Sequence, residues 1–177
     1  MAILIPPISI EPMQERDLEA VAAIDRQCYS TPWYYSAYVT ELSNRSAMYF
    51  VAREGNKVVG YAGVWAVMDE GHITTLAVDP HRQGRKIGER LLLTLIDEAR
   101  YKRVKHLKLE VRESNRIAQN LYRKYGFKPM AMRKNYYSDT GENAIVMWAN
   151  DIHLSEFRAM LEERRQALDR YYQQQGY

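Results

Sequence analysis

The sequence contains very little cysteine and no long hydrophobic run. Cys28 is the single cysteine among 177 residues, which excludes an intramolecular disulfide and is typical of a reducing compartment. No apolar stretch approaches the roughly 20 residues that a membrane-spanning helix requires. The first residues, Met1 to Pro7, lack the basic start and long apolar core of a signal peptide. We therefore expect a soluble cytoplasmic protein that does not bind membranes.

An excess of one charge and a metal-ligand spacing are also lacking. The 25 lysines and arginines nearly balance the 22 aspartates and glutamates, so the net charge is only +3 and we expect no direct contact with nucleic acid. The four histidines show no spacing typical of metal ligands, which predicts that the protein binds no metal. Cys28 has no histidine motif beside it, so we do not expect it to carry an acyl group.

Hydrophobic periodicity and turn residues indicate one mixed α/β domain. The pattern predicts strands at 8–13, 48–53, 58–67, 71–78, 106–112, 127–136 and 143–148, and helices at 17–28, 35–42, 86–102 and 115–125. A hydrophobic fraction of 46% suffices for one core. Residues 154–172 predict a further amphipathic helix, whose apolar face either packs on the domain or contacts a dimer partner or the ribosome.

The two commonest phosphate loops are absent, but another anion-binding turn is present. The sequence has neither G-x-x-x-x-G-K-[ST] nor a G-x-G-x-x-G that opens an early βαβ unit. Residues 83–88, which we call the phosphate turn, follow a strand that ends at Val78. They include the start of a helix that begins near Lys86. Unpaired N–H groups at a helix start attract anions, and glycines let a ligand approach the backbone. Mobile positive charge comes from Arg82, Arg85, Lys86 and Arg90. The turn therefore predicts a pyrophosphate site.

The phosphate turn fits the pattern [Q/R]-x-x-G-x-[G/A], with Gln83 first and Gly88 last. In this pattern the chain resembles the GNAT acetyltransferases. In those enzymes the segment with this pattern binds the pyrophosphate of coenzyme A. One position departs, because Lys86 stands where the first glycine is usual. We expect a helical φ at Lys86, which any residue except proline tolerates.

Other segments extend the resemblance to residues 8–149 and leave 150–177 as a C-terminal helical extension. They are L-E-V-R-x-S-N at 109–115, A-x-x-L-Y-x-x-x-G-F at 118–127, R-x-N-Y-Y at 133–137, P-W at 32–33 and the segment 139–147. The resemblance implies the GNAT fold, which is a mixed, mostly antiparallel central sheet flanked by helices, here followed by a C-terminal amphipathic helix.

The resemblance also implies acetyl-CoA as the co-substrate. In GNAT folds the strand at 71–78 splays from the next strand, so its free backbone amides meet the pantetheine arm and the thioester oxygen. Asn115 is expected to cap the following helix and to bond the pantetheine arm. The residues expected to bind the cofactor are Leu76, Ala77, Val78, Gln83, Gly84, Arg85, Lys86, Ile87, Gly88, Glu89 and Asn115.

Two residues are candidates for proton transfer. Glu110 interrupts an apolar strand and by alternation shares a face with Lys108 and Arg112, which alone allows an exposed glutamate. The resemblance implies a general base at this position of L-E-V-R, and we expect a partly buried carboxylate with a raised pKa. Tyr122 lies two helical turns after Asn115 on the same face. The residues alone allow a core tyrosine, whereas the resemblance implies an acid that protonates the leaving sulfur.

The resemblance is strongest to bacterial enzymes that acetylate the N-terminal alanine of a small-subunit ribosomal protein. It implies this reaction, by direct attack of the amine on the thioester. We expect Trp33, Tyr136 and Tyr137 to line the peptide cleft. For each of the three, packing in the core is an equally good alternative. The alternatives are an N-terminal acetyltransferase of broader range, a lysine or small-amine acetyltransferase, and a non-catalytic acyl-CoA-binding module. The sequence leaves the oligomeric state and the exact protein substrate open.

Overall fold

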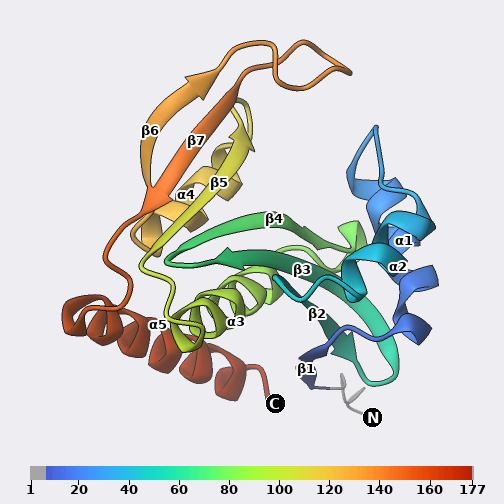
Figure 1. The fold of residues 1–177 in the computed structure, drawn as a ribbon. Coiled ribbons are helices and arrows are strands. Elements are labelled where there is room, and N and C mark those ends of the chain that lie inside the picture. Colours follow the sequence, from blue (N-terminus) through green and yellow to red (C-terminus); the bar gives the residue numbers. More distant parts are fainter. Residues whose placement is uncertain (1–6, 177) are drawn as a thin grey trace.

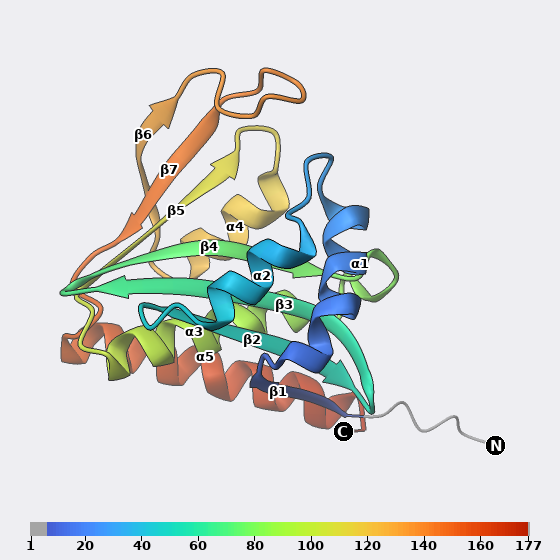
Figure 2. The ribbon, with the colours of Figure 1, turned by 45° about the vertical axis from the view of Figure 1, so that its right-hand side comes forward.

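The computed structural model describes residues 7–176, which form a seven-stranded mixed sheet with helices on both faces (Figures 1 and 2). Residues 1–6, which include most of the segment where we expect no signal peptide, lie outside the described range. The strands in sheet order are β1 (Ile8–Pro12), β2 (Ala47–Glu54), β3 (Lys57–Val67), β4 (Glu70–Val78), β5 (His106–Arg112), β7 (Ala144–Ala149) and β6 (Lys128–Arg133). Only the β4–β5 pair is parallel among these strands, which confirms the predicted mixed, mostly antiparallel sheet.

The helices cover the two faces of the sheet with two separate apolar clusters. They are α1 (Leu18–Cys28), α2 (Tyr35–Leu42), α3 (Ile87–Tyr101), α4 (Arg116–Lys124) and α5 (Ser155–Gln174), with short 3-10 turns at 15–17 and 80–82. Leu91, Leu95 and Ile96 of α3 pack on one face with α4 and α5. Leu18 and Val21 of α1 pack on the other face with α2. The apolar periodicity of each helix therefore matches the face that it buries.

The sheet opens between β4 and β5. These strands pair only through Glu70 with His106, Gly71 with Leu107 and His72 with Lys108. Beyond that point β4 continues its pairing with β3, and β5 continues its pairing with β7. Figure 1 shows β5, β7 and β6 turning away from β4 toward the ends of the two parallel strands. The backbone of 73–78 therefore has no strand partner on its β5 side within the described chain.

The C-terminal helix α5 lies along α3 on the same face of the sheet (Figure 2). Leu161 and Leu168 are buried, and Arg165 pairs with Asp97 of α3 at an N···O distance of 2.7 Å. The amphipathic pattern predicted for 154–172 is thus found as a helix at 155–174 that packs back on the domain. Across residues 7–176, none of the helices combines the length and the apolar character needed to span a bilayer.

Candidate active site

Two adjoining clefts lie where β4 and β5 separate. The larger cleft, of about 540 Å³, is lined by the end of β4, the phosphate turn and the start of α4. The smaller cleft, of about 230 Å³, is lined by the α1–α2 loop, the middle of β4 and β5, Tyr122 of α4 and the β6–β7 loop. Tyr29 and Leu76 line both clefts. The two spaces therefore meet at these residues, beside the part of β4 that has no pairing with β5.

The phosphate turn contains two residues in the left-handed conformation. Gly84 has φ +83°, and Lys86 has φ +59° immediately before α3 begins. The expectation of a helical φ at Lys86 is therefore wrong. A left-handed backbone costs a non-glycine residue about 1–2 kcal/mol, which gives a physical reason for the glycine that is usual at this position. The ammonium of Lys86 lies 4.7 Å from the centre of the Tyr171 ring, a cation–π contact that offsets part of this cost.

The cations around the turn are held by partners, so the expected mobile charge is wrong. The guanidinium of Arg85 pairs with the Glu54 carboxylate. The guanidinium nitrogens of Arg82 lie 3.4 Å from Asp79 Oδ2 and 3.6 Å from Glu54 Oε1. Arg90 donates to the carbonyl of Ile8 and points away from the larger cleft. Of the four cations, Arg82 and Lys86 line the larger cleft.

The other residues predicted to bind the cofactor at this turn lie at the start of α3 or just before it. The carboxylate of Glu89 accepts from the Tyr125 hydroxyl and from Lys124 Nζ, each at 2.8 Å, so its side chain is engaged elsewhere. The larger cleft is lined by Gln83, which follows the 3-10 turn at 80–82, and by Ile87 and Gly88 at the start of α3. A Cβ added at Gly88 would meet nothing closer than Val78 Cγ2, at 3.7 Å. The helix start therefore leaves open space beside its backbone.

The end of β4 forms one wall of the larger cleft. Leu76, Ala77 and Val78 all line it, as does Asn115 at the start of α4. Asn115 Oδ1 accepts from the backbone N–H of Ala118 at 3.1 Å, which confirms it as the helix cap.

Cys28 also lines the larger cleft. Burial raises the pKa of its thiol, and the nearby Asp25 and Asp79 raise it further. The thiol donates toward the carbonyl of Val78 at 3.4 Å. A thiol that stays protonated is a poor nucleophile, which agrees with the expectation that Cys28 carries no acyl group.

Glu110 forms a close pair with His72, a residue that the sequence interpretation missed. Glu110 Oε2 lies 2.6 Å from His72 Nε2, and 8% of the Glu110 side chain is exposed against 29% of the His72 side chain. The hydrogen bond from His72 lowers the pKa of Glu110 and outweighs the opposing effect of burial. The expectation of a raised pKa is therefore wrong. The parallel pairing of β4 and β5, which places His72 opposite Lys108, brings the two side chains together.

Replacing His72 by phenylalanine is expected to raise the pKa of Glu110, because burial then acts without the hydrogen bond. An amine acceptor with a pKa near 8 gives log kcat/KM a slope of about one below that pH. Below the pKa of the base the slope increases by a second unit. In the parent this change of slope is expected below the ordinary glutamate pKa, and in His72→Phe it is expected to move toward neutral pH. The pH profile of kcat/KM measures it. His72→Gln, which keeps an N–H donor, should retain the change of slope at low pH, and identical profiles for all three proteins would contradict the assigned interaction.

Tyr122 lies in the smaller cleft with Glu110. Its ring is buried against Phe127, at 5.9 Å between ring centres, and burial raises the pKa of its phenol. Its hydroxyl forms no hydrogen bond with any described residue. A neutral phenol that faces a cleft can donate a hydrogen bond without first losing or gaining charge.

Aromatic side chains from two loops complete the smaller cleft. Trp33, Tyr136 and Tyr137 all line it. The buried carboxylate of Asp25 accepts from the backbone N–H of Trp33 at 2.7 Å and fixes the α1–α2 loop. The guanidinium of Arg112 stacks on the Tyr137 ring at 4.0 Å.

The two loops are joined across the smaller cleft. Asp139 of the β6–β7 loop accepts from Ser30 of the α1–α2 loop and pairs with Arg112 at 2.8 Å. These contacts hold the rim of the smaller cleft from both sides.

Comparison with known proteins assigns the family. The model of the acetyltransferase (GNAT) family matches residues 18–127, which is more than half of the chain. The chain belongs to the GNAT family. A GNAT protein named N-alpha-acetyltransferase RimI, from Mycobacterium tuberculosis, is 37% identical over 147 residues, covering 80% of this chain and 91% of the relative.

Two further comparisons link the chain to proteins that act on a ribosomal protein. The Escherichia coli enzyme named [ribosomal protein bS18]-alanine N-acetyltransferase is 34% identical over 141 residues, covering 78% of this chain and 95% of the relative. The crystal structure of the ribosomal-protein-S18-alanine N-acetyltransferase from Escherichia coli superposes with a TM-score of 0.76 at 32% identity. It covers 82% of this chain and 94% of that chain. These matches confirm the predicted GNAT fold and acetyltransferase activity.

GNAT enzymes take their acetyl group from acetyl-CoA, and the residues of the larger cleft fit this molecule. The N-terminal amides of α3 and the cations Arg82 and Lys86 suit a pyrophosphate. The apolar side chains of Ile117, Ala118 and Leu121 suit a pantetheine arm beside them. When bound there, acetyl-CoA supplies the thioester that is cleaved.

Replacing Gly88 by valine is expected to weaken coenzyme A binding about fivefold to tenfold, since a side chain would occupy the space beside the helix amides. Lys86→Gly should bind within about threefold of the parent, because glycine adopts the left-handed φ freely. Calorimetric titration with coenzyme A compares the two variants. Loss of binding in Lys86→Gly with normal binding in Gly88→Val would refute a site built from backbone amides.

Proposed function

We propose that this GNAT enzyme acetylates the N-terminal alanine of a small-subunit ribosomal protein of the bS18 type. The observation that carries the proposal is the joint position of Glu110 and Tyr122 in the smaller cleft, beside the residues that it shares with the larger one. The names of relatives at 34–38% identity support the same acceptor.

Glu110 is proposed to accept the proton of the attacking amine, directly or through water. An α-amino group has a pKa near 8 and is mostly charged at neutral pH, so a base must remove its proton before attack. The lowered pKa of Glu110 keeps the carboxylate ionised throughout the neutral range and ready to accept. His72, which holds the carboxylate at 2.6 Å, orients it toward the acceptor.

The amine is proposed to add first to the acetyl carbon, and Tyr122 is proposed to donate a proton or hydrogen bond to the sulfur when the C–S bond then breaks. The backbone amides of Leu76, Ala77 and Val78 are proposed to bind the pantetheine arm and to stabilise the thioester oxygen as it becomes negative. Trp33, Tyr136 and Tyr137 are proposed to hold the acceptor peptide, with the aromatic rings excluding water from the amine.

The substrate is tested with a purified ribosomal protein that begins with a free alanine. After incubation with acetyl-CoA, peptide mass mapping locates the acetyl group. Acetylation at the N-terminal alanine and not at lysines is expected. Equal acetylation of peptides that begin with other residues would favour a broader N-terminal acetyltransferase, and acetylation at lysines would favour a lysine acetyltransferase. Binding of acetyl-CoA without transfer to any of these acceptors would favour a non-catalytic module.

A further inference from the structure

The C-terminal helix contacts the phosphate turn, although α5 lies outside the residues that the family model matches. The hydroxyl of Tyr172 donates a hydrogen bond of 2.7 Å to the carbonyl oxygen of Arg85. The ring of the preceding Tyr171 lies 4.7 Å from the ammonium of Lys86. Two consecutive tyrosines of α5 therefore hold two consecutive residues of the turn.

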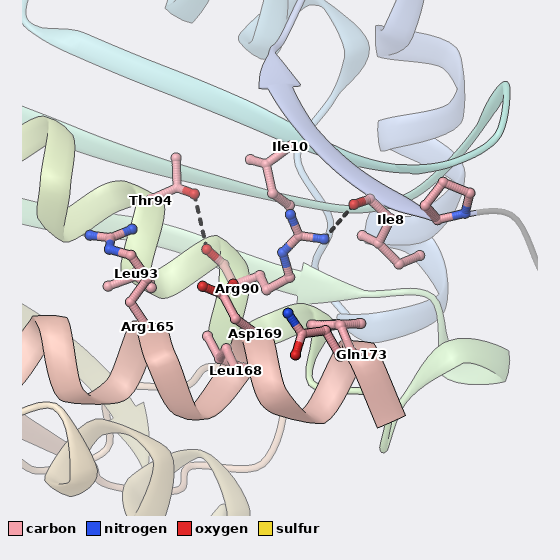
Figure 3. A pocket seen from close by; sticks show the side chains of 11 residues that line it. Ile8, Ile10, Arg90, Leu93, Thr94, Arg165, Leu168, Asp169 and Gln173 are labelled. Atoms are coloured by element: carbon pink, nitrogen blue, oxygen red, sulfur yellow. Dashed lines mark hydrogen bonds between the residues drawn. The ribbon is translucent and has the colours of Figure 1, made fainter. Parts of the chain in front are cut away.

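The contact is made beside a cavity, and the Tyr172 ring also packs against the edge of the core. A space of about 470 Å³ is lined by the C-terminal half of α5, by α3 and by β1. Figure 3 shows Arg165, Leu168 and Asp169 of α5 facing Arg90 and Thr94 of α3 across it. Tyr172 lines the same cavity, and the Arg90 guanidinium lies 5.1 Å from its ring centre. Tyr172 thus borders this cavity on one side and contacts the phosphate turn on the other.

The hydrogen bond fixes the direction of a peptide group in the phosphate turn. The carbonyl of Arg85 and the N–H of Lys86 belong to one trans peptide unit, in which C=O and N–H point in opposite directions. A carbonyl held toward α5 therefore directs the Lys86 N–H away from α5. Lys86 itself lines the larger cleft, where the pyrophosphate is expected.

The backbone conformation of the phosphate turn gives such a contact a stabilising role. Lys86 has φ +59°, a conformation that is disfavoured for lysine. Gly84, two residues earlier, has φ +83°, and a Cβ added there would meet no atom within 4 Å. Glu54 holds the Arg85 guanidinium from the β2–β3 hairpin, and Tyr172 holds the Arg85 carbonyl from α5. Side chains from both directions thus fix one residue of the turn.

We propose that Tyr172 is a positioning residue for acetyl-CoA, which makes the C-terminal helix part of the cofactor site. Its hydroxyl orients the Arg85–Lys86 peptide so that the Lys86 N–H is available to the pyrophosphate. The role rests on the proposed binding of acetyl-CoA at the phosphate turn and is independent of the acceptor, because binding of coenzyme A alone reports it.

Tyr172→Phe tests the role, since it removes the hydroxyl and keeps the ring over Arg90. Tyr101→Phe makes the same chemical change at an exposed position at the end of α3 and is the matched control. The Kd for coenzyme A is measured by calorimetry, with KM for acetyl-CoA, kcat at saturation and a melting curve. Loss of one positioning hydrogen bond is expected to raise Kd and KM about fivefold in Tyr172→Phe, with kcat unchanged. Tyr101→Phe should match the parent in every measurement.

Four results would overturn the proposal. They are an unchanged Kd in Tyr172→Phe, an equal rise of Kd in both variants, a fall in kcat at unchanged KM, and a lower melting temperature with unchanged Kd. The last would assign the tyrosine to helix packing alone. Failure of the protein to acetylate a ribosomal protein would leave the coenzyme A titration interpretable, so the two proposals fail separately.

Discussion

Replacing Glu110 by glutamine is expected to lower turnover by roughly 10² to 10⁴, the usual contribution of general acid–base catalysis. Glutamine keeps the size of the side chain and can still meet His72, but it cannot accept a proton from the amine. The carboxylate lies in the smaller cleft rather than among the residues of the phosphate turn, so the affinity for acetyl-CoA should stay within about twofold. Steady-state kinetics with a peptide that begins with alanine measures both quantities.

Glu70→Gln provides the matched control for this change. Glu70 is exposed at the start of β4, so the same loss of one carboxylate there should leave turnover near that of the parent. The loss in Glu110→Gln should persist across the neutral pH range, because the parent carboxylate is ionised throughout it. Normal turnover of Glu110→Gln at every pH would return Glu110 to a structural role.

Replacing Tyr122 by phenylalanine is expected to lower turnover at least about tenfold, which corresponds to roughly 1.4 kcal/mol of transition-state stabilisation. The change removes one hydroxyl and almost no volume. Since that hydroxyl has no hydrogen-bond partner among residues 7–176, the free energy of unfolding should change by less than about 1 kcal/mol. Rates with an alanine-starting peptide, measured beside a melting curve and a coenzyme A titration, separate catalysis from packing and binding.

Tyr101→Phe serves again as the control, because its exposed hydroxyl lies at the end of α3. Unchanged rates in both variants would leave water as the proton donor and assign Tyr122 to the core. A fall in the melting temperature of Tyr122→Phe together with unchanged rates would lead to the same conclusion.

The sequence predicted the elements well because each has its own periodicity and its own turn. The helix that begins after the phosphate turn shows its apolar face in Ile87, Leu91 and Leu95, and all three are buried as that face requires. Asn115 was predictable as a cap because asparagine before a helical pattern satisfies the N–H groups of its first turn. Residues of the two clefts likewise lie in motifs that are contiguous in sequence.

Contacts between distant segments were not predictable in the same way. His72 and Glu110 are 38 positions apart, and only the parallel pairing of their strands brings them within hydrogen-bonding distance. Because His72 was missed, burial alone determined the expected pKa of Glu110, and the predicted direction was wrong. The left-handed φ of Lys86 was missed because the helical pattern was extended one residue too far toward the N-terminus. A glycine preference at that position was the signal that could have indicated it.

The most direct test of the account is release of thiol from acetyl-CoA with two versions of one peptide. Both begin with the N-terminal sequence of a bS18-type ribosomal protein, one with a free alanine and one with its amine blocked. The account predicts thiol release with the free peptide at a rate that depends on Glu110, and only background release with the blocked peptide. Equal release with both peptides, or equal release by the parent and Glu110→Gln, would contradict direct transfer of the acetyl group to the α-amine with Glu110 as the base.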